Sequence, residues 1–123
     1  MNPFEDQARF MTACEQTVSQ WNEEQFNLYT GLIAEEVEEL WTANGAADPV
    51  ACLDALIDIM VVAIGAMHSL GADAEGAWQE VMRTNLAKID PDTGAVRRRV
   101  SDGKILKPPG WRPPVLDPYL RVR

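Results

Sequence analysis

Cysteine is scarce in this chain, which contains only Cys14 and Cys52 among its 123 residues. The two share no C-x-x-C spacing, so neither a disulfide framework nor a zinc site is expected, and a reducing compartment fits. The N-terminus lacks the basic segment and the apolar run of a secretory signal. We therefore expect a cytoplasmic protein, acting in the host cytoplasm if a phage or mobile element encodes it.

Basic residues are also few, because 11 Lys and Arg stand against 19 Asp and Glu and the formal net charge is −8. This imbalance argues against a nucleic acid or an anionic membrane as the partner. The longest apolar stretch, residues 55–70, carries Asp58 and His68, and we expect it to be too short and too polar to span a bilayer. An acidic chain can still bind a polyphosphate when divalent cations lie between its carboxylates and the ligand.

Helical periodicity dominates what the chain does contain. Apolar residues recur at three-to-four spacing, and the pattern predicts four helices, over about residues 4–18, 22–43, 50–70 and 74–89. Asn22 and Asp73 are suited to cap the second and fourth helices, while Gly45 and Gly71 are suited to end the second and third. The expected fold class is all-α, a four-helix bundle within a single domain over residues 1–123.

A basic, proline-rich C-terminal arm, residues 90–123, follows the helical core of about residues 4–89. Residues 95–123 hold five of the eight prolines, so a further helix is not expected there. A short ribbon is predicted around residues 96–100, with irregular structure beyond residue 107. Because an extended segment of this kind rarely packs on its own core, we expect the arm to wrap a neighbouring chain or to cover a site.

The run E-E-V-E-E-L, residues 35–40, places its four glutamates on different sides of the second helix. At 100° per residue, Glu36 falls inside the apolar stripe, whereas Glu35 and Glu39 lie on one flank of it. Glu38 faces outward, as a solvated charge run would predict for all four. That simpler interpretation does not suit Glu36, because an unpaired buried carboxylate is costly or shifts its pKa.

The third helix carries two further carboxylates in an apolar setting. Asp54 and Asp58 are spaced i, i+4 and share a face of a helix that is apolar nearly all round and is therefore expected to be central. Arg9 is the only basic residue before Arg83, so ion pairs cannot easily compensate them. A divalent cation held by carboxylates from two facing helices would do so. The alternative is a buried acid that is hydrogen-bonded or protonated.

Other polar residues offer candidate ligand contacts. Asn85 is predicted at the centre of the apolar stripe of the fourth helix, with Lys88 on its flank, where they could meet a ligand hydroxyl and a phosphate. A satisfied core asparagine and a solvated lysine are the alternative. Trp21 and Asn22 offer a stacking ring and an amide that could read a base edge, or else a buried tryptophan beside a helix cap.

Taken in order, these segments resemble the MazG-like all-α nucleoside triphosphate pyrophosphatases, a superfamily that includes dimeric dUTPases and phosphoribosyl-ATP pyrophosphohydrolase. The similarity covers about residues 28–116, and its signature is E-E-x-x-E on one helix followed by E-x-x-D on the next. Four segments carry it: E-E-V-E-E-L, the helix that begins D-A-L-I-D, R-T-N-L-A-K at residues 83–88, and D-G-K-I-L-K-P-P-G-W-R-P-P at residues 102–114.

The resemblance implies Mg²⁺, for which Mn²⁺ can substitute, and hydrolysis of a nucleoside triphosphate to the monophosphate and pyrophosphate, for nucleotide-pool control. Its signature assigns Glu36, Glu39 and Asp58 as metal ligands. The second family glutamate would fall at Ala55, so its role is carried to Asp54 instead. Glu35 is implied to bind a second metal or to orient the attacking water, and the catalytic pair is then Glu35 and Glu36.

The resemblance also implies substrate contacts and assembly. Lys88, Lys104 and Lys107, or the arginines at 97–99, are expected to clamp phosphates, and Asn85 to contact the sugar. Relatives of this size form homodimers or homotetramers whose sites use neighbouring chains. Two other functions stay open: a nucleotide-binding regulatory module with impaired catalysis, since the position of the family glutamate is Ala55 here, and a purely structural oligomerisation bundle.

Overall fold

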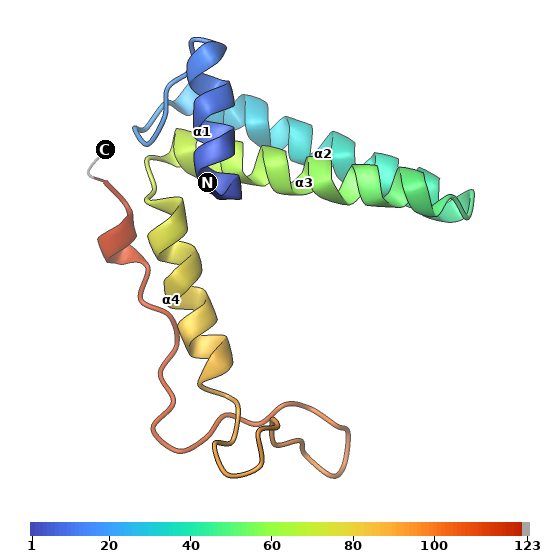
Figure 1. Ribbon diagram of the computed structural model, residues 1–123, viewed down its shortest axis with the longest axis vertical. Helices are drawn as coiled ribbons and strands as arrows, with labels where there is room; N and C mark the ends of the chain where they lie inside the picture. The colour runs from blue at the N-terminus through green and yellow to red at the C-terminus, as the bar shows by residue number, and fades with distance from the viewer. Residues whose placement is uncertain (122–123) are drawn as a thin grey trace. The chain divides into compact units, whose positions relative to one another are not determined.

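The structure, a computed structural model, describes residues 1–121 of the protein. It contains four α-helices and one 3₁₀ helix: α1 (Pro3–Ala13), α2 (Glu23–Gly45), α3 (Pro49–Leu70), α4 (Ala74–Leu86) and η1 (Asp117–Tyr119) (Figure 1). Within residues 1–121 there is no β-strand, only isolated bridges, so the predicted all-α class is confirmed. The last two residues of the predicted arm, 122 and 123, lie outside the described part.

Local chemistry explains most helix ends. Asn22 Oδ1 accepts the backbone N–H of Gln25 at 3.1 Å and caps α2 as predicted, and Asp48 caps α3 in the same way at 3.1 Å from Ala51 N. Gly71 ends α3 with φ of 85°, a conformation that a glycine adopts without steric cost. These boundaries follow from residue types that satisfy the free backbone groups of a helix end.

Two predicted boundaries were wrong. The first helix ends at Ala13 instead of continuing to Val18, because Glu15 adopts φ of 59°. The side chain of Gln25 on α2 then hydrogen-bonds to both the N–H and the carbonyl oxygen of Thr17. The fourth helix ends at Leu86 instead of residue 89. Ile89 forms an antiparallel bridge with Val96, so it lies outside the helix. In both places the apolar pattern continues for several residues, but a contact with a residue more distant in sequence ends the helix earlier.

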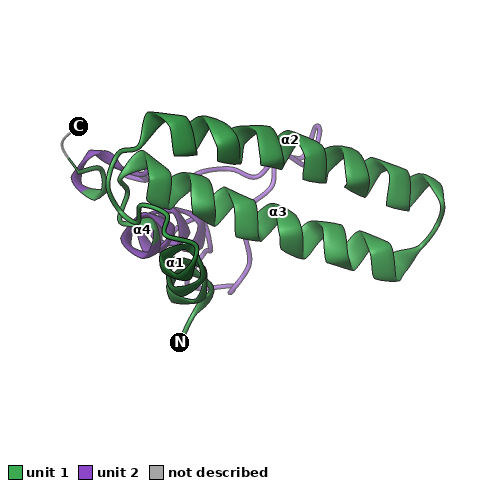
Figure 2. Ribbon diagram, turned by 90° about the horizontal axis from the view of Figure 1, so that it is seen from above, with its two compact units in different colours: residues 1–74, 119–123 green, residues 75–118 purple. Residues whose placement is uncertain are grey.

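The chain divides into two compact units (Figure 2). In the first, residues 1–74 and the chain from 119 onward, α2 and α3 form a long antiparallel hairpin, and α1 lies across it near the start of α2 and the end of α3 (Figures 1 and 2). The buried core of this unit consists of Met11, Tyr29, Val62 and Ala66, with Val18, Phe26, Leu32 and Ile33 packed against them.

A polar network joins the loop after α1 to the hairpin. Gln25 Nε2 donates to the Ser69 hydroxyl at 2.8 Å, and Ser69 is completely buried. His68, predicted to be structural, is 6% exposed, and its Nε2 lies 3.0 Å from the carbonyl oxygen of Phe4. The tyrosine hydroxyl of Tyr29 donates to Gln16. Because these buried polar groups are paired, the network holds the start of α2 and the end of α3 together.

One face of α3 is not covered within this unit, although a helix that is apolar nearly all round was expected to be central. Leu53, Ile57 and Met60 are 61%, 50% and 50% exposed. Among residues 1–121, α3 is the one helix long and apolar enough to cross a membrane by length and composition, with a mean hydropathy of 2.2. It nevertheless carries Asp54 and Asp58, and helices that build a soluble core or interface have the same composition. Exposed apolar faces of this size often mark interaction sites in proteins.

The second unit, residues 75–118, consists of α4 and most of the arm. The predicted ribbon forms as two isolated antiparallel bridges, Ile89 with Val96 and Arg98 with Ile105. The arm then returns to α4, where the Val115 N–H donates to Glu80 at 2.8 Å. This hydrogen bond holds that part of the arm on its own helix, and the expectation that the arm wraps a neighbouring chain or covers a site stays a prediction.

Candidate metal centre

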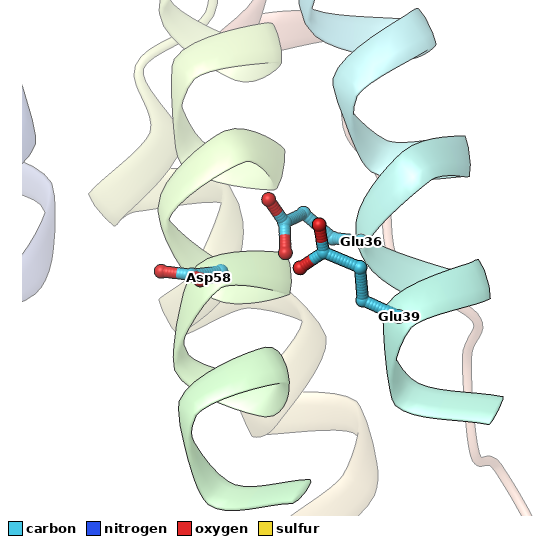
Figure 3. A group of neighbouring side chains, drawn as sticks. All are labelled: Glu36, Glu39 and Asp58. Atoms are coloured by element: carbon cyan, nitrogen blue, oxygen red, sulfur yellow. The ribbon is translucent and has the colours of Figure 1, made fainter. Parts of the chain in front are cut away.

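Three carboxylates converge between α2 and α3. Glu36 and Glu39 are spaced i, i+3 on α2 and leave it on the side of α3, which carries Asp58 (Figure 3). One oxygen from each of the three lies within 4.8 Å of the others. Two oxygens on opposite sides of one Mg²⁺ are about 4.2 Å apart, and about 5 Å apart for Ca²⁺. The three side chains therefore have the spacing to bind one hard divalent cation after a small adjustment.

Glu36 is the electrostatically strained member of the group. Its Oε2 is buried, and no donor within residues 1–121 hydrogen-bonds to it. Burial raises the pKa of the Glu36 carboxyl above its ordinary value, and the neighbouring carboxyl of Glu39 raises it further, followed by Asp58 and Asp54. A buried acceptor that faces other acids and has no basic partner is satisfied by a cation. The residues present thus fit a divalent metal ion.

The other predicted acidic residues lie outside this group. Asp54 is exposed, although its charge is close enough to raise the pKa of Glu36. Ala55, one residue later, is only 3% exposed, so the family position faces the interior and Asp54 is rotated away from it. Glu35 and Glu38 are exposed and line a depression that Glu39 also borders. Of the five proposed carboxylates, the structure brings together three.

Trp21 and Asn22 lie at the start of α2. Both ends of the Asn22 amide are engaged, since Oδ1 caps the helix and Nδ2 donates to the Thr17 hydroxyl at 3.0 Å. The Trp21 ring lies 5.6 Å from the ring of Phe26 at a tilt of 46°. Trp21 is half-buried beside the cap of α2, so the alternative of a fully buried tryptophan is not met.

Asn85 is exposed, so its predicted place at the centre of a buried stripe was wrong. The covered side of α4 instead contains Thr84, which is 2% exposed, because the arm returns over that side. The Asn85 side chain accepts a hydrogen bond from Lys88 Nζ at 3.3 Å. The hydrogen bond therefore links exposed Asn85, near the end of α4, to Lys88 just beyond that end.

Positive charge is concentrated in the second unit. Residues 75–118 contain eight of the eleven basic residues against six acidic ones, a net charge of +2 in a chain whose total is −8. Arg97 and Arg99 are paired with Asp90 and Asp102, at 3.1 Å and 2.9 Å. The predicted Lys104 is exposed on the ribbon.

Lys88 and Lys107, both predicted to bind phosphate, converge on a residue that sequence reasoning did not single out, Trp111. Their ammonium nitrogens lie 5.3 Å and 4.6 Å from the centre of its ring. The signal available in the sequence was the position of this tryptophan in the segment K-P-P-G-W. No local periodicity relates it to α4.

Comparison with known proteins matches this chain to a family. A model of the family described as phosphoribosyl-ATP pyrophosphohydrolase matches residues 7–85, which is well over half of the chain and reaches from α1 into α4. A search of curated proteins finds no match. The matched segment includes the three converging carboxylates and Asn85, and it ends before Lys88 and the arm.

Proposed function

The chain belongs to the phosphoribosyl-ATP pyrophosphohydrolase family, within the MazG-like all-helical pyrophosphohydrolase superfamily, and on that premise we propose that it hydrolyses a (deoxy)nucleoside triphosphate between the α and β phosphates. The products would be the nucleoside monophosphate and pyrophosphate, and the role would be control of a nucleotide pool. The observation that carries the proposal is the convergence of Glu36, Glu39 and Asp58 around a buried oxygen with no donor in the described chain.

In this proposal Glu36, Glu39 and Asp58 hold Mg²⁺, or Mn²⁺ in its place, and Asp54 adds negative charge beside them. When bound, the metal neutralises charge on the phosphate oxygens and lowers the pKa of the attacking water. The rigid α2–α3 hairpin keeps the two glutamates opposite Asp58 before any ligand arrives. Such preorganisation avoids the cost of assembling three like charges during the reaction.

Glu35 is proposed to orient the attacking water. It lies one residue before Glu36 on α2 and is exposed, so a water bound to it can approach the carboxylate group from solvent. The water oxygen would attack the α-phosphorus, the bond from that phosphorus to the bridging oxygen would break, and pyrophosphate would leave. Glu35 would accept the proton that the water loses. An exposed carboxylate suits this role because solvent water can reach it and hydrogen-bond to it.

Substrate contacts are proposed for the second unit. Asn85 would contact the sugar, and Lys88, Lys104 and Lys107 would bind phosphate oxygens. The net positive charge of residues 75–118 supports this assignment. Asn22 is proposed to act only as the cap of α2, because its amide is already bonded, and Trp21 remains the candidate for stacking on a base.

A second copy of the chain is proposed to cover the exposed face of α3, giving a homodimer or homotetramer. Large apolar side chains on that face are half exposed or more, which is unusual for a protein that acts as a monomer. Met60→Glu, at a side chain that is 50% exposed, should reduce the molecular mass in solution measured by light scattering. Val100→Glu, at the most exposed apolar residue of the ribbon, is the matched control and should leave the mass unchanged. An unchanged mass for both variants would contradict the proposed interface.

The activity itself is tested by product analysis. The protein, Mg²⁺ and each dNTP are incubated, with phosphoribosyl-ATP as a further substrate because the family description names it. The expected products are pyrophosphate and a monophosphate, and release of orthophosphate alone would exclude the proposed reaction. Preference for phosphoribosyl-ATP over every dNTP would leave the proposed cleavage between the α and β phosphates unchanged, and would replace a dNTP by phosphoribosyl-ATP as the substrate.

Matched variants connect the activity to the site. Glu36→Gln should abolish turnover, whereas Glu38→Gln, two residues along the same helix and exposed, should retain it. Circular dichroism checks that both variants keep their helices. If the wild-type protein binds nucleotide in a metal-dependent way without turnover, the alternative of a catalytically impaired binding module is selected.

A further inference from the structure

Trp111 is held rigidly against α4. Its indole N–H donates to the carbonyl oxygen of Thr84 at 2.7 Å, and Thr84 is 2% exposed. On the other side, the Trp111 backbone N–H closes a turn onto the carbonyl of Pro108 at 3.1 Å, and Gly110 within that turn has φ of 80°. A glycine is needed at this φ. The ring is therefore fixed both by its edge and by its backbone.

Two ammonium groups converge on this fixed ring. Lys107 Nζ lies 4.6 Å and Lys88 Nζ 5.3 Å from the ring centre, and both distances are within the range of a cation–π contact. Lys88 Nζ also donates to Asn85 Oδ1 at 3.3 Å. Two positive charges gathered on one ring repel each other. A polyphosphate whose oxygens reach both ammonium groups would offset this repulsion.

Neither lysine has a carboxylate partner among the described residues. Four of the five arginines within 75–118 are already engaged: Arg83 with Glu80, Arg97 with Asp90, Arg99 with Asp102, and Arg98 with the carbonyl of Gly103. The Asn85 side-chain oxygen accepts one N–H of Lys88. The Trp111 ring attracts the ammonium group but offers no oxygen atom as a hydrogen-bond acceptor. The remaining ammonium N–H groups need oxygen acceptors, and phosphate supplies several with negative charge.

We propose that Trp111 is a positioning residue that holds Lys88 and Lys107 as a preformed receptor for two adjacent phosphate groups, which binds them without metal. This proposal rests on the proposed function in one respect: the two phosphate groups are taken to belong to a nucleoside triphosphate. Free pyrophosphate, the product, carries the same chemistry. The acidic α2–α3 hairpin would need a cation to bind a polyphosphate, whereas this receptor would not.

The test is metal-free binding, measured by calorimetry on the full chain in the presence of a chelator. Inorganic tripolyphosphate, pyrophosphate, a dNTP and a dNMP are compared. The first three should bind, and the dNMP, with one phosphate, should bind about tenfold more weakly, since a charge-assisted hydrogen bond is lost. Preference for the dNTP over tripolyphosphate assigns the nucleotide as carrier. Equal binding of the dNMP would overturn recognition of adjacent phosphates.

Charge variants locate the receptor. Lys88→Gln and Lys107→Gln should each weaken tripolyphosphate binding by about tenfold. Arg112→Gln removes one charge next to Trp111 in sequence and should weaken binding by less than about twofold, because attraction to a single exposed charge is screened by salt. An equal loss of affinity in all three variants would mean that tripolyphosphate binding depends only on the net charge of the protein, and would overturn the proposal.

Ring variants test the positioning role. Trp111→Phe and Trp111→Leu both lose the hydrogen bond to Thr84, and only phenylalanine keeps an aromatic face. Binding should be about fivefold to tenfold weaker for the leucine variant than for the phenylalanine variant, which corresponds to one cation–π contact. Equal affinities would reduce Trp111 to a structural role and overturn the positioning claim.

The outcomes separate this inference from the proposed function. Turnover with metal, together with unchanged metal-free binding by the lysine variants, would overturn only the receptor. Metal-free binding that depends on both lysines, in a protein without turnover, would overturn only the enzyme.

Discussion

The packing of α2 on α3 gives the sharpest prediction, through Gly65 on α3. A Cβ atom added at Gly65 would overlap three ring atoms of Tyr29 on α2. Tyr29 is 5% exposed and its hydroxyl is bonded to Gln16, so the ring cannot move aside freely. Gly65→Ala should therefore push the two helices apart. The three carboxylates proposed to bind metal lie across this same helix pair.

The magnitude follows from two opposing effects. Alanine in place of glycine inside a helix stabilises it by about 1 kcal/mol. Overpacking a core destabilises by about 1–3 kcal/mol, and an overlap with three atoms of a restrained ring belongs at the upper end. The free energy of unfolding of Gly65→Ala should thus fall by about 1–2 kcal/mol, and each kcal/mol corresponds to about 3–6 °C in Tm for a chain of this length.

Gly31→Ala on α2 is the matched control. Gly31 is exposed, and a Cβ atom added there meets nothing within 4 Å. That variant keeps only the gain in helix propensity and should be stabilised by up to about 1 kcal/mol. Both variants gain the same helix propensity, so the difference between their free energies of unfolding measures the steric overlap with Tyr29 alone. We expect this difference to be about 2–3 kcal/mol.

The assay is thermal and urea unfolding of both variants without metal, followed by the same measurement with Mg²⁺. Gly65→Ala should show a smaller Mg²⁺-dependent rise in Tm than the wild type, because a metal that binds only the native state stabilises it in proportion to its affinity. Equal stabilisation of both glycine variants would refute the close contact between α2 and α3 at Tyr29.

Two further predictions concern charged groups. Asp58→Asn should remove most of the Mg²⁺-dependent rise in Tm, whereas Asp54→Asn, outside the converging group, should keep most of it; equal losses would place Asp54 among the ligands. Glu80 has its pKa lowered to about 2 by the hydrogen bond from Arg83 and then by the backbone N–H of Val115. Since the folded-state pKa is depressed, its stabilising contribution is complete above the ordinary value of 4.5 and is lost as the pH falls towards 2. The protection factor of the Val115 amide, which is its exchange rate compared with the intrinsic rate at the same pH, should therefore be high at pH 5 and low near pH 2. Protection that persists in Glu80→Leu, which has no acceptor, would show that another group holds the arm.

Sequence periodicity predicted much of the fold because helix formation is largely a local property. The caps at Asn22 and Gly71 depend on one side chain or one φ angle, and both were predicted correctly. The inward direction of Glu36 follows from 100° of rotation per residue, and its buried oxygen agrees with that phase. The end of α1 could not be predicted in this way, because it depends on Gln25 reaching the backbone of Thr17.

The sequence by itself determined the four helices, the acidic character of the α2–α3 pair and the family to which the chain belongs. Only the tertiary structure decided which carboxylates meet, since the relative rotation of α2 and α3 brings Asp58 into the group and leaves Asp54 outside. It also decided that Asn85 is exposed and that Lys88 and Lys107 share the ring of Trp111. These outcomes depend on contacts between residues distant in sequence, and helical periodicity contains no information about which distant side chain will lie opposite.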